Sequence, residues 1–125
     1  MVCTLAVGVS DPLVRAYVQG LGDHNALWFG ANPSRRSPLA PETGLRYVPD
    51  KVAERIELAD AATVYARGSG SCGSLACAVY GYMRAQRKLP LLLTQRVSAN
   101  MWHVVVRLPN GSIWDARKSM VAHAA

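Results

Sequence analysis

The hydrophobic pattern of this chain changes its period once, near Pro90, and that change restricts the fold more than any other feature. Before it, apolar residues from Leu75 to Met83 recur at the three- and four-residue spacing of a buried helix. After it, they follow strand-like patterns in three runs, 91–97, 101–108 and 112–116. A helix followed by antiparallel strands, in 125 residues without an internal repeat, predicts one α+β domain spanning residues 1–125.

The first part of the chain contains a clear helix start. Ser10 supplies a capping side chain and Pro12 stands at the start of the first helical turn, while Gly20 and Gly22 are expected to end the helix. Residues 23–43 are rich in Asn, Pro and Gly, so they predict a long irregular segment that wraps around the domain.

A second helix is predicted to begin at Pro49 and Asp50 and to end near Tyr65. Apolar residues recur on one side of it while charged residues keep another side in water; the apolar positions are Val52, Ile56 and Ala59. His24 and His123 lie in segments without a strong pattern and are expected at the surface.

The composition excludes several classes of protein. Lysine and arginine outnumber aspartate and glutamate by 14 to 8, but they are scattered, which predicts weak attraction for anions rather than a specific nucleic-acid groove. No apolar stretch approaches the roughly 20 residues of a membrane helix, so no membrane partner is expected. No secretory signal is recognised at the N-terminus, which favours a cytoplasmic or virion-associated location.

Cysteine usage points to one residue with possible chemistry. The three cysteines are an odd number without C-x-x-C spacing, so no disulfide framework is expected, and Cys77 is interpreted as a core residue. Cys72 stands at the first turn of the buried helix, where the helix dipole favours a thiolate by about 0.3–1 kcal/mol. A pKa lowered by several units also needs an imidazolium beside the sulfur and an acid behind the imidazole.

His103 and Asp115 lie on the two strands of the terminal hairpin. If residues 109–111 form a three-residue turn with Gly111 in the left-handed conformation, Val105 falls opposite Asp115. His103 and Asp115 are then diagonal neighbours on one face, within reach of a hydrogen bond from Nδ1–H to the carboxylate. A two-residue turn would place them on opposite faces, but the proline and glycine positions favour the three-residue turn.

These segments together resemble the transglutaminase-like cysteine peptidase superfamily, and most closely its short bacterial and phage-encoded members. The resemblance is carried by residues 45–50 (LRYVPD), the helix start at 70–72 (GSC), the His103 strand and the 114–115 strand. It covers about residues 45–118, which would form the catalytic-type core, with residues 1–44 as an N-terminal helix and wrapping segment.

The resemblance implies a papain-like fold, in which a central cysteine-bearing helix packs on an antiparallel sheet, and a thiol-dependent amidase or peptidase. The triad would be Cys72, His103 and Asp115, acting on peptide or isopeptide amides, with hydrolysis favoured over crosslinking. The Cys72 N–H is expected to bind the oxyanion, and the candidates for a second donor are Tyr47 and Gln95. No cofactor is expected.

Other interpretations of the same residues stay open. Each of the three has an ordinary structural role available: a buried thiol, a strand histidine and a strand-end cap. A metal site built from the triad and Cys77 is disfavoured because no pair has a short chelate spacing. The competing function is a catalytically silent structural or assembly component, for instance of a phage particle, whose partner is another protein rather than a peptide substrate.

Overall fold

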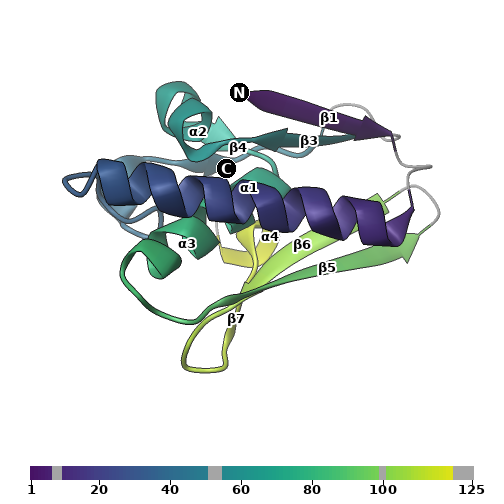
Figure 1. The fold of residues 1–125 in the computed structure, drawn as a ribbon. Helices are drawn as coiled ribbons and strands as arrows, with labels where there is room; N and C mark the ends of the chain where they lie inside the picture. Colours follow the sequence, from purple (N-terminus) through teal and green to yellow (C-terminus); the bar gives the residue numbers. More distant parts are fainter. Residues whose placement is uncertain (7–9, 51–54, 99–100, 120–125) are drawn as a thin grey trace.

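The fold is described by a computed structural model for residues 1–6, 10–50, 55–98 and 101–119 (Figure 1). Its helices are α1 (Asp11–Ala31), α2 (Ala61–Arg67), α3 (Cys72–Ala85) and α4 (Ala116–Ser119), with a 3₁₀ turn at Pro41–Thr43. Its strands are β1 (Val2–Ala6), β2 (Arg46–Tyr47), β3 (Arg55–Ala59), β4 (Ser69–Gly70), β5 (Leu91–Ser98), β6 (Met101–Arg107) and β7 (Ile113–Trp114). This content confirms the predicted α+β class.

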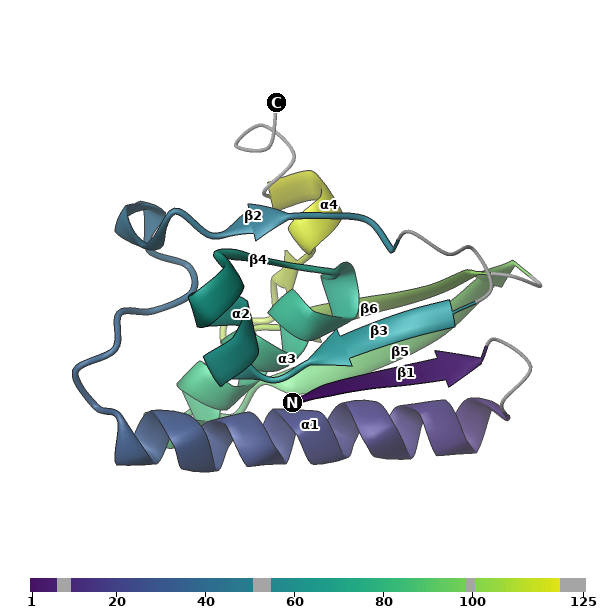
Figure 2. The same ribbon diagram turned by 90° about the horizontal axis from the view of Figure 1, so that it is seen from above.

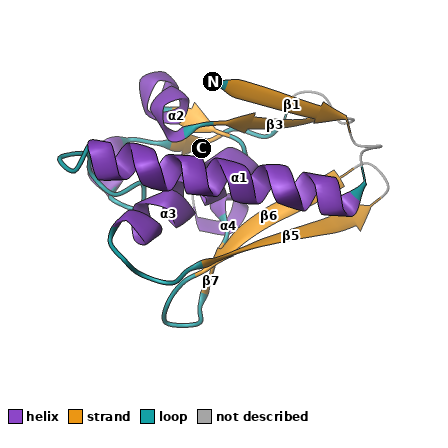
Figure 3. Cartoon of the chain, viewed as in Figure 1, coloured by secondary structure: helices purple, strands orange, loops and turns teal. Residues whose placement is uncertain are grey.

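The strands in the described ranges form three small sheets. β5, β6 and β7 make an antiparallel sheet in that order, β1 pairs antiparallel with β3, and the short β2 pairs parallel with β4. Figure 3 shows the β1–β3 pair and the β5–β6–β7 sheet above and below α1, and Figure 2 shows β2 and α4 on the side of the molecule away from α1. α3 lies inside, where it contacts α1, β3 and β6.

The main hydrophobic core joins distant parts of the sequence. It contains Leu5 of β1, Val14 of α1, Leu58 of β3, Val79 of α3 and Val104 of β6, all buried. The N-terminal segment therefore packs into the same core as the segment that carries Cys72. None of the helices within the described ranges is long and apolar enough to cross a bilayer.

The contact between α1 and α3 depends on glycines. A Cβ at Gly22 would lie 2.7 Å from a ring carbon of Tyr80, and a Cβ at Gly81 would lie 2.5 Å from the Cβ of Asn25. Because no larger side chain fits without movement, these glycines let the two helices approach closely.

The prediction that Gly20 and Gly22 end the first helix is therefore wrong. α1 continues through both to Ala31, so residues 23–31 are helical and the irregular segment begins only at Asn32. Each glycine costs a helix interior about 1 kcal/mol relative to alanine, and the buried face of a 21-residue helix outweighs that cost.

The second predicted helix is wrong for most of its length. Residues Arg55–Ala59 form β3, in which Ile56 pairs with Leu5 and Leu58 pairs with Cys3 of β1. Ile56 and Leu58 are buried on either side of Glu57, which is the alternation of a strand. The spacing of Val52, Ile56 and Ala59 fits a helix equally well, so the local pattern does not choose between the two. Pairing with β1, which sequence reasoning did not anticipate, selects the strand.

Helix forms only in the last part of that segment, as α2. The Asp60 side chain accepts a hydrogen bond from the Thr63 N–H at 3.0 Å, and Gly68 ends the helix in the left-handed conformation at φ 76°. Val52, assigned to the same helix, lies outside the described residues, as does His123. His24 is exposed on α1, as expected, with Nε2 3.5 Å from Asp60 Oδ2.

Candidate active site

The terminal hairpin brings His103 and Asp115 together. Gly111 adopts the left-handed conformation with φ 89°, and the Leu108 N–H donates to the Ser112 carbonyl at 2.8 Å, which is the predicted three-residue register. His103 Nε2 lies 2.9 Å from Asp115 Oδ2, and the two side chains are only 13% and 8% exposed. This short contact between the partly buried imidazole and the carboxylate holds the imidazole in one orientation.

The ring nitrogen that faces the carboxylate differs from the expectation. Nε2 makes the contact with Asp115, whereas Nδ1 is buried and has no hydrogen-bond partner in the described chain. When Asp115 is ionised it only accepts, so Nε2 carries the proton and Nδ1 holds the free lone pair. Nδ1 is therefore the atom able to accept a proton from another group.

Cys72 is placed at the first turn of α3 by local capping and close packing. The Ser71 side chain accepts a hydrogen bond from the Ser74 N–H and donates one to the Glu57 carbonyl at 2.8 Å, which fixes the start of the helix against β3. A Cβ at Gly73 would lie 2.8 Å from Leu58 Cδ2, so the glycine lets this turn approach the strands. The resulting position confirms the predicted helix start.

The Cys72 thiol lies near an unpaired stretch of the edge of β6. β7 pairs only with Val106 and Arg107, so the Val104 N–H, two residues earlier on the same edge, has no strand beside it. That N–H and the N–H of Gly73 both interact with the Cys72 sulfur. Because Val104 follows His103 directly, the thiol lies beside the backbone of the residue that carries the imidazole.

The thiol is held in its protonated form. Burial raises the pKa of Cys72 and outweighs the opposing effects of the Val104 and Gly73 N–H groups and of the Arg117 guanidinium. The sequence suggested a lowered pKa, but that required an imidazolium in contact with the sulfur, and no hydrogen bond joins His103 Nδ1 to any described residue. The structure therefore contains a protonated thiol near a base rather than a preformed thiolate–imidazolium pair.

Tyr47 is brought to the site and Gln95 to its flank. β2 runs parallel to β4, with Tyr47 paired to Gly70 just before Cys72. Burial raises the pKa of Tyr47, nearby acidic groups raise it further and Arg117 lowers it, so its hydroxyl shares the surroundings of the site. Gln95 pairs directly with His103 across the sheet and is exposed on the same face.

Two charged groups near the thiol were missed by sequence reasoning. Asp50 raises the pKa of Cys72 and Arg117 lowers it, so both lie within electrostatic range of the sulfur. The backbone N–H of Arg117 also donates a hydrogen bond to Asp115 Oδ1 at 2.9 Å. Asp50 ends segment 45–50, and Arg117 follows the 114–115 strand by two residues, so proximity to these motifs was the available signal.

The described residues contain no group of three or more His, Cys, Asp or Glu side chains arranged to hold a metal ion. Cys77, the remaining thiol of α3, is fully buried, and its Sγ donates to the Val18 carbonyl at 3.4 Å. Its position confirms the core role predicted for it.

Comparison with known proteins adds no relative: no family model, no curated protein and no solved structure matches this chain. A protonated thiol at a helix start, a base with one free nitrogen and a carboxylate behind it are the parts needed for nucleophilic acyl transfer.

Proposed function

We propose that this chain is a thiol-dependent amidase or peptidase of transglutaminase-like, papain-like architecture, acting through Cys72, His103 and Asp115. One observation carries the proposal: the buried imidazole is held by Asp115 at Nε2, while its free Nδ1 belongs to the residue next to the N–H that meets the Cys72 sulfur. A histidine with a merely structural role would be expected to have both buried nitrogens satisfied.

The reaction follows from these roles. The Cys72 sulfur attacks the amide carbon and forms an S–C bond, while His103 Nδ1 takes the thiol proton and Asp115 stabilises the imidazolium. His103 then gives that proton to the departing nitrogen as the C–N bond breaks, which releases an amine and leaves a thioester. Water attacks the thioester carbon while His103 takes its proton, and His103 gives this proton to the sulfur as the S–C bond breaks. The products are a carboxylic acid and the restored thiol.

The proposal requires a movement of the nucleophile. The Val104 N–H interacts with the sulfur and no hydrogen bond joins the thiol to His103 Nδ1, so the thiol must turn toward Nδ1 to give up its proton. The raised pKa of Cys72 fits a mechanism in which His103 removes the proton during attack, rather than one that begins from a resting thiolate.

The oxyanion would be bound at the start of α3. Cys72 is the first residue of the helix, so its N–H is one of the donors that the helix itself leaves unpaired. The Tyr47 hydroxyl, on the strand beside this turn, is the second donor that we propose. Gln95 is exposed opposite His103, where it is better placed to contact a bound substrate than the oxyanion.

Trapping of the acyl intermediate tests the proposal. The purified protein is incubated with a panel of peptide amides and γ-glutamyl isopeptides, quenched in acid and analysed by mass spectrometry. We expect a mass increase equal to the acyl group on the peptide that contains Cys72, together with free amine. Cys72→Ala should abolish both, and His103→Gln should lower the rate of amine release by about a hundredfold or more.

Cys3→Ala serves as the matched control, because Cys3 is a free, half-buried thiol outside the site. It should leave amine release unchanged. Amine release that survives Cys72→Ala, or acylation of Cys3 and Cys72 at equal rates, would contradict the proposal.

The second candidate function is a catalytically silent component of a protein assembly, such as a phage particle. It is favoured by the partly buried, protonated thiol and by the lack of a hydrogen bond between Cys72 and His103. Under this function, Cys72→Ala would preserve folding and binding of the partner, and no substrate in the panel would give a thioester. We propose a location in the cytoplasm or in a virion, and a virion would suit the assembly component in particular.

A further inference from the structure

The outer edge of β5 has unpaired backbone groups. The Leu108 N–H donates to the Ser112 carbonyl on the β7 side, so by alternation Val104 also directs its N–H away from β5. His103 and Val105 therefore direct theirs toward β5, where they pair with Gln95 and Leu93. Backbone groups alternate along a strand, so the N–H and C=O groups of the intervening Leu92 and Thr94 point to the outer edge. Within the described residues, these groups form no hydrogen bond.

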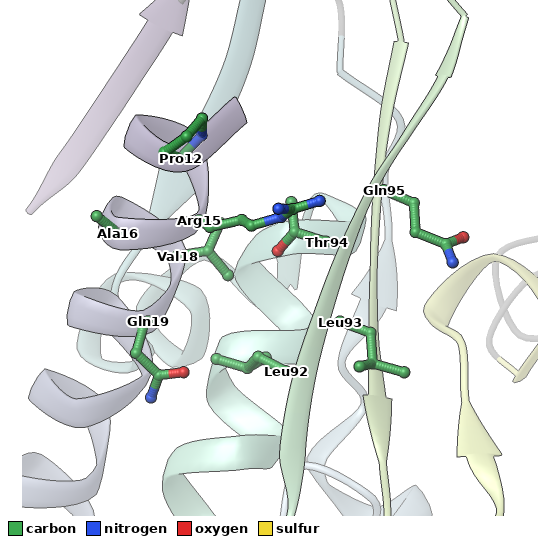
Figure 4. A pocket seen from close by; sticks show the side chains of 9 residues that line it. All are labelled: Pro12, Arg15, Ala16, Val18, Gln19, Leu92, Leu93, Thr94 and Gln95. Atoms are coloured by element: carbon green, nitrogen blue, oxygen red, sulfur yellow. The ribbon is translucent and has the colours of Figure 1, made fainter. Parts of the chain in front are cut away.

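A groove of about 600 Å³ runs along this edge, between β5 and the first half of α1 (Figure 4). Its helix side is kept open by the small side chains of Pro12 and Ala16, and the other side is the strand from Leu92 to Gln95. Edge strands of soluble proteins are usually blocked by a bulge, a proline or a covering segment. Leu92–Gln95 lies in regular register with β6 and contains no proline. α1 packs beside β5, and the groove is the space left between them, so an added strand would have to lie within this groove.

The groove carries one uncompensated positive charge. Arg15 extends from α1 toward Thr94 in Figure 4, and it forms no ion pair within the described part of the chain. Asp11, one turn earlier, is paired with Arg96 at 3.1 Å, and Asp23 accepts hydrogen bonds from the Gln19 and Tyr80 side chains. A carboxylate in the middle of the groove would therefore meet Arg15 as its nearest unpaired charge.

We propose that the β5 edge binds an extended peptide segment with an acidic side chain, which adds to the sheet as a further strand and places its carboxylate against Arg15. The backbone of the peptide would pair with the outward N–H and C=O groups of Leu92 and Thr94, and the apolar walls of the groove would cover small side chains of the peptide. This binding does not depend on the chemistry proposed for Cys72, because β5 and β6 separate the groove from the thiol.

A second copy of the chain is a poorer occupant than an acidic peptide. Pairing of two β5 edges would bring two Arg15 side chains into the same groove without an acidic partner for either. Each copy also carries a formal charge of +6, which opposes self-association.

The test uses capped heptapeptides in which threonine and valine alternate around a central glutamate, or around a central lysine. Binding is measured by fluorescence anisotropy, and backbone amide exchange is measured by NMR on the intact chain. We expect the glutamate peptide to bind and to slow exchange of the Leu92 and Thr94 amides by about tenfold or more. Arg15→Glu should weaken binding of the glutamate peptide by about tenfold and should strengthen binding of the lysine peptide.

Two further variants separate strand addition from simple charge attraction. Ala16→Trp fills the groove from an exposed helix position, and Thr94→Pro removes one outward N–H, so each should abolish binding of the glutamate peptide. The matched control is Arg107→Glu, which changes the same charge at an exposed position of β6 outside the groove and should leave binding unchanged.

Four results with the peptides would overturn the proposal. They are absence of binding, equal loss with Arg107→Glu and Arg15→Glu, binding that is unaffected by Ala16→Trp, and amide protection that maps away from Leu92 and Thr94. Protection of these two amides that grows with protein concentration, without peptide, would also overturn it by assigning the edge to a second copy. Because Ala16→Trp and Arg15→Glu change exposed side chains, they keep the test decisive even if Thr94→Pro does not fold.

Discussion

The two halves of the candidate site reach their positions by different means. His103 and Asp115 belong to one hairpin, are twelve residues apart and are joined by a 2.9 Å contact, because the turn register places them on one face. Cys72 reaches them through the packing of α3 against β3 and β6, and burial raises the pKa of its thiol. The imidazole of His103 is therefore positioned in advance by the hairpin, whereas the Cys72 thiol is kept neutral by its burial.

The largest effect on stability is expected at the hairpin half, from Asp115→Ala. This change leaves both nitrogens of a buried imidazole without a partner and removes the acceptor of the Arg117 N–H, so the free energy of unfolding should fall by about 3 kcal/mol. Urea denaturation measures the difference. Asp11→Ala, which removes a carboxylate from a partly exposed ion pair, is the control and should cost less than about 1 kcal/mol.

The thiol half can be disturbed by steric means. Gly73→Ala would place a Cβ 2.8 Å from Leu58 Cδ2 inside the core, and we expect a loss of about 1–3 kcal/mol with displacement of the Cys72 turn. Gly20→Ala meets nothing within 4 Å in a helix interior and should instead stabilise by about 0.5–1 kcal/mol. Thermal unfolding of the two variants compares them, and equal shifts in Tm would show that the close approach at Gly73 is unimportant.

A smaller effect is expected where α3 begins. Ser71→Ala removes the cap of the helix that carries Cys72 and a hydrogen bond to the Glu57 carbonyl, which should cost about 1–2 kcal/mol. Ser10 occupies the same position before α1, but its side chain makes no capping hydrogen bond. Ser10→Ala should therefore change the free energy of unfolding by less than about 0.5 kcal/mol, and a cost equal to that of Ser71→Ala would contradict this account.

The smallest effect at neutral pH concerns the thiol itself, since a raised pKa leaves Cys72 protonated in both the folded and the unfolded chain. As the pH rises through the ordinary thiol range, the unfolded chain loses its proton first, so folding stability falls until the folded pKa is passed. Alkylation of Cys72 by iodoacetamide should accordingly begin at a higher pH in the native protein than in urea. Fast native labelling at pH 6 would instead indicate the preformed thiolate that the sequence suggests.

The hairpin was predictable because its geometry is local. The proline and glycine of the 109–111 turn select a three-residue loop, and the two-residue alternation of strands then fixes which side chains share a face. The start of α3 was predictable for a related reason: a glycine-rich run and a serine cap precede an apolar stripe of helical spacing. The ring nitrogen that contacts Asp115 was not, because it depends on the rotation of the His103 side chain.

The first half of the chain shows where local reasoning ends. Gly22 looks like a helix breaker in the sequence, but in the fold it is the position where Tyr80 approaches α1. Ile56 fits a helical stripe, but its environment is decided by Leu5 of β1, 51 residues earlier in the sequence. In both cases a partner distant in sequence supplies the free energy that overrides the local preference.

The sequence by itself determined the α+β class, the start of the cysteine-bearing helix and the shared face of His103 and Asp115, because these follow from turn chemistry and side-chain periodicity. Only the tertiary structure decided the length of α1, the strand at Arg55–Ala59 and the environment of the Cys72 thiol. These depend on which surfaces are buried against each other, and burial both outweighs helix propensity and raises the pKa of a thiol.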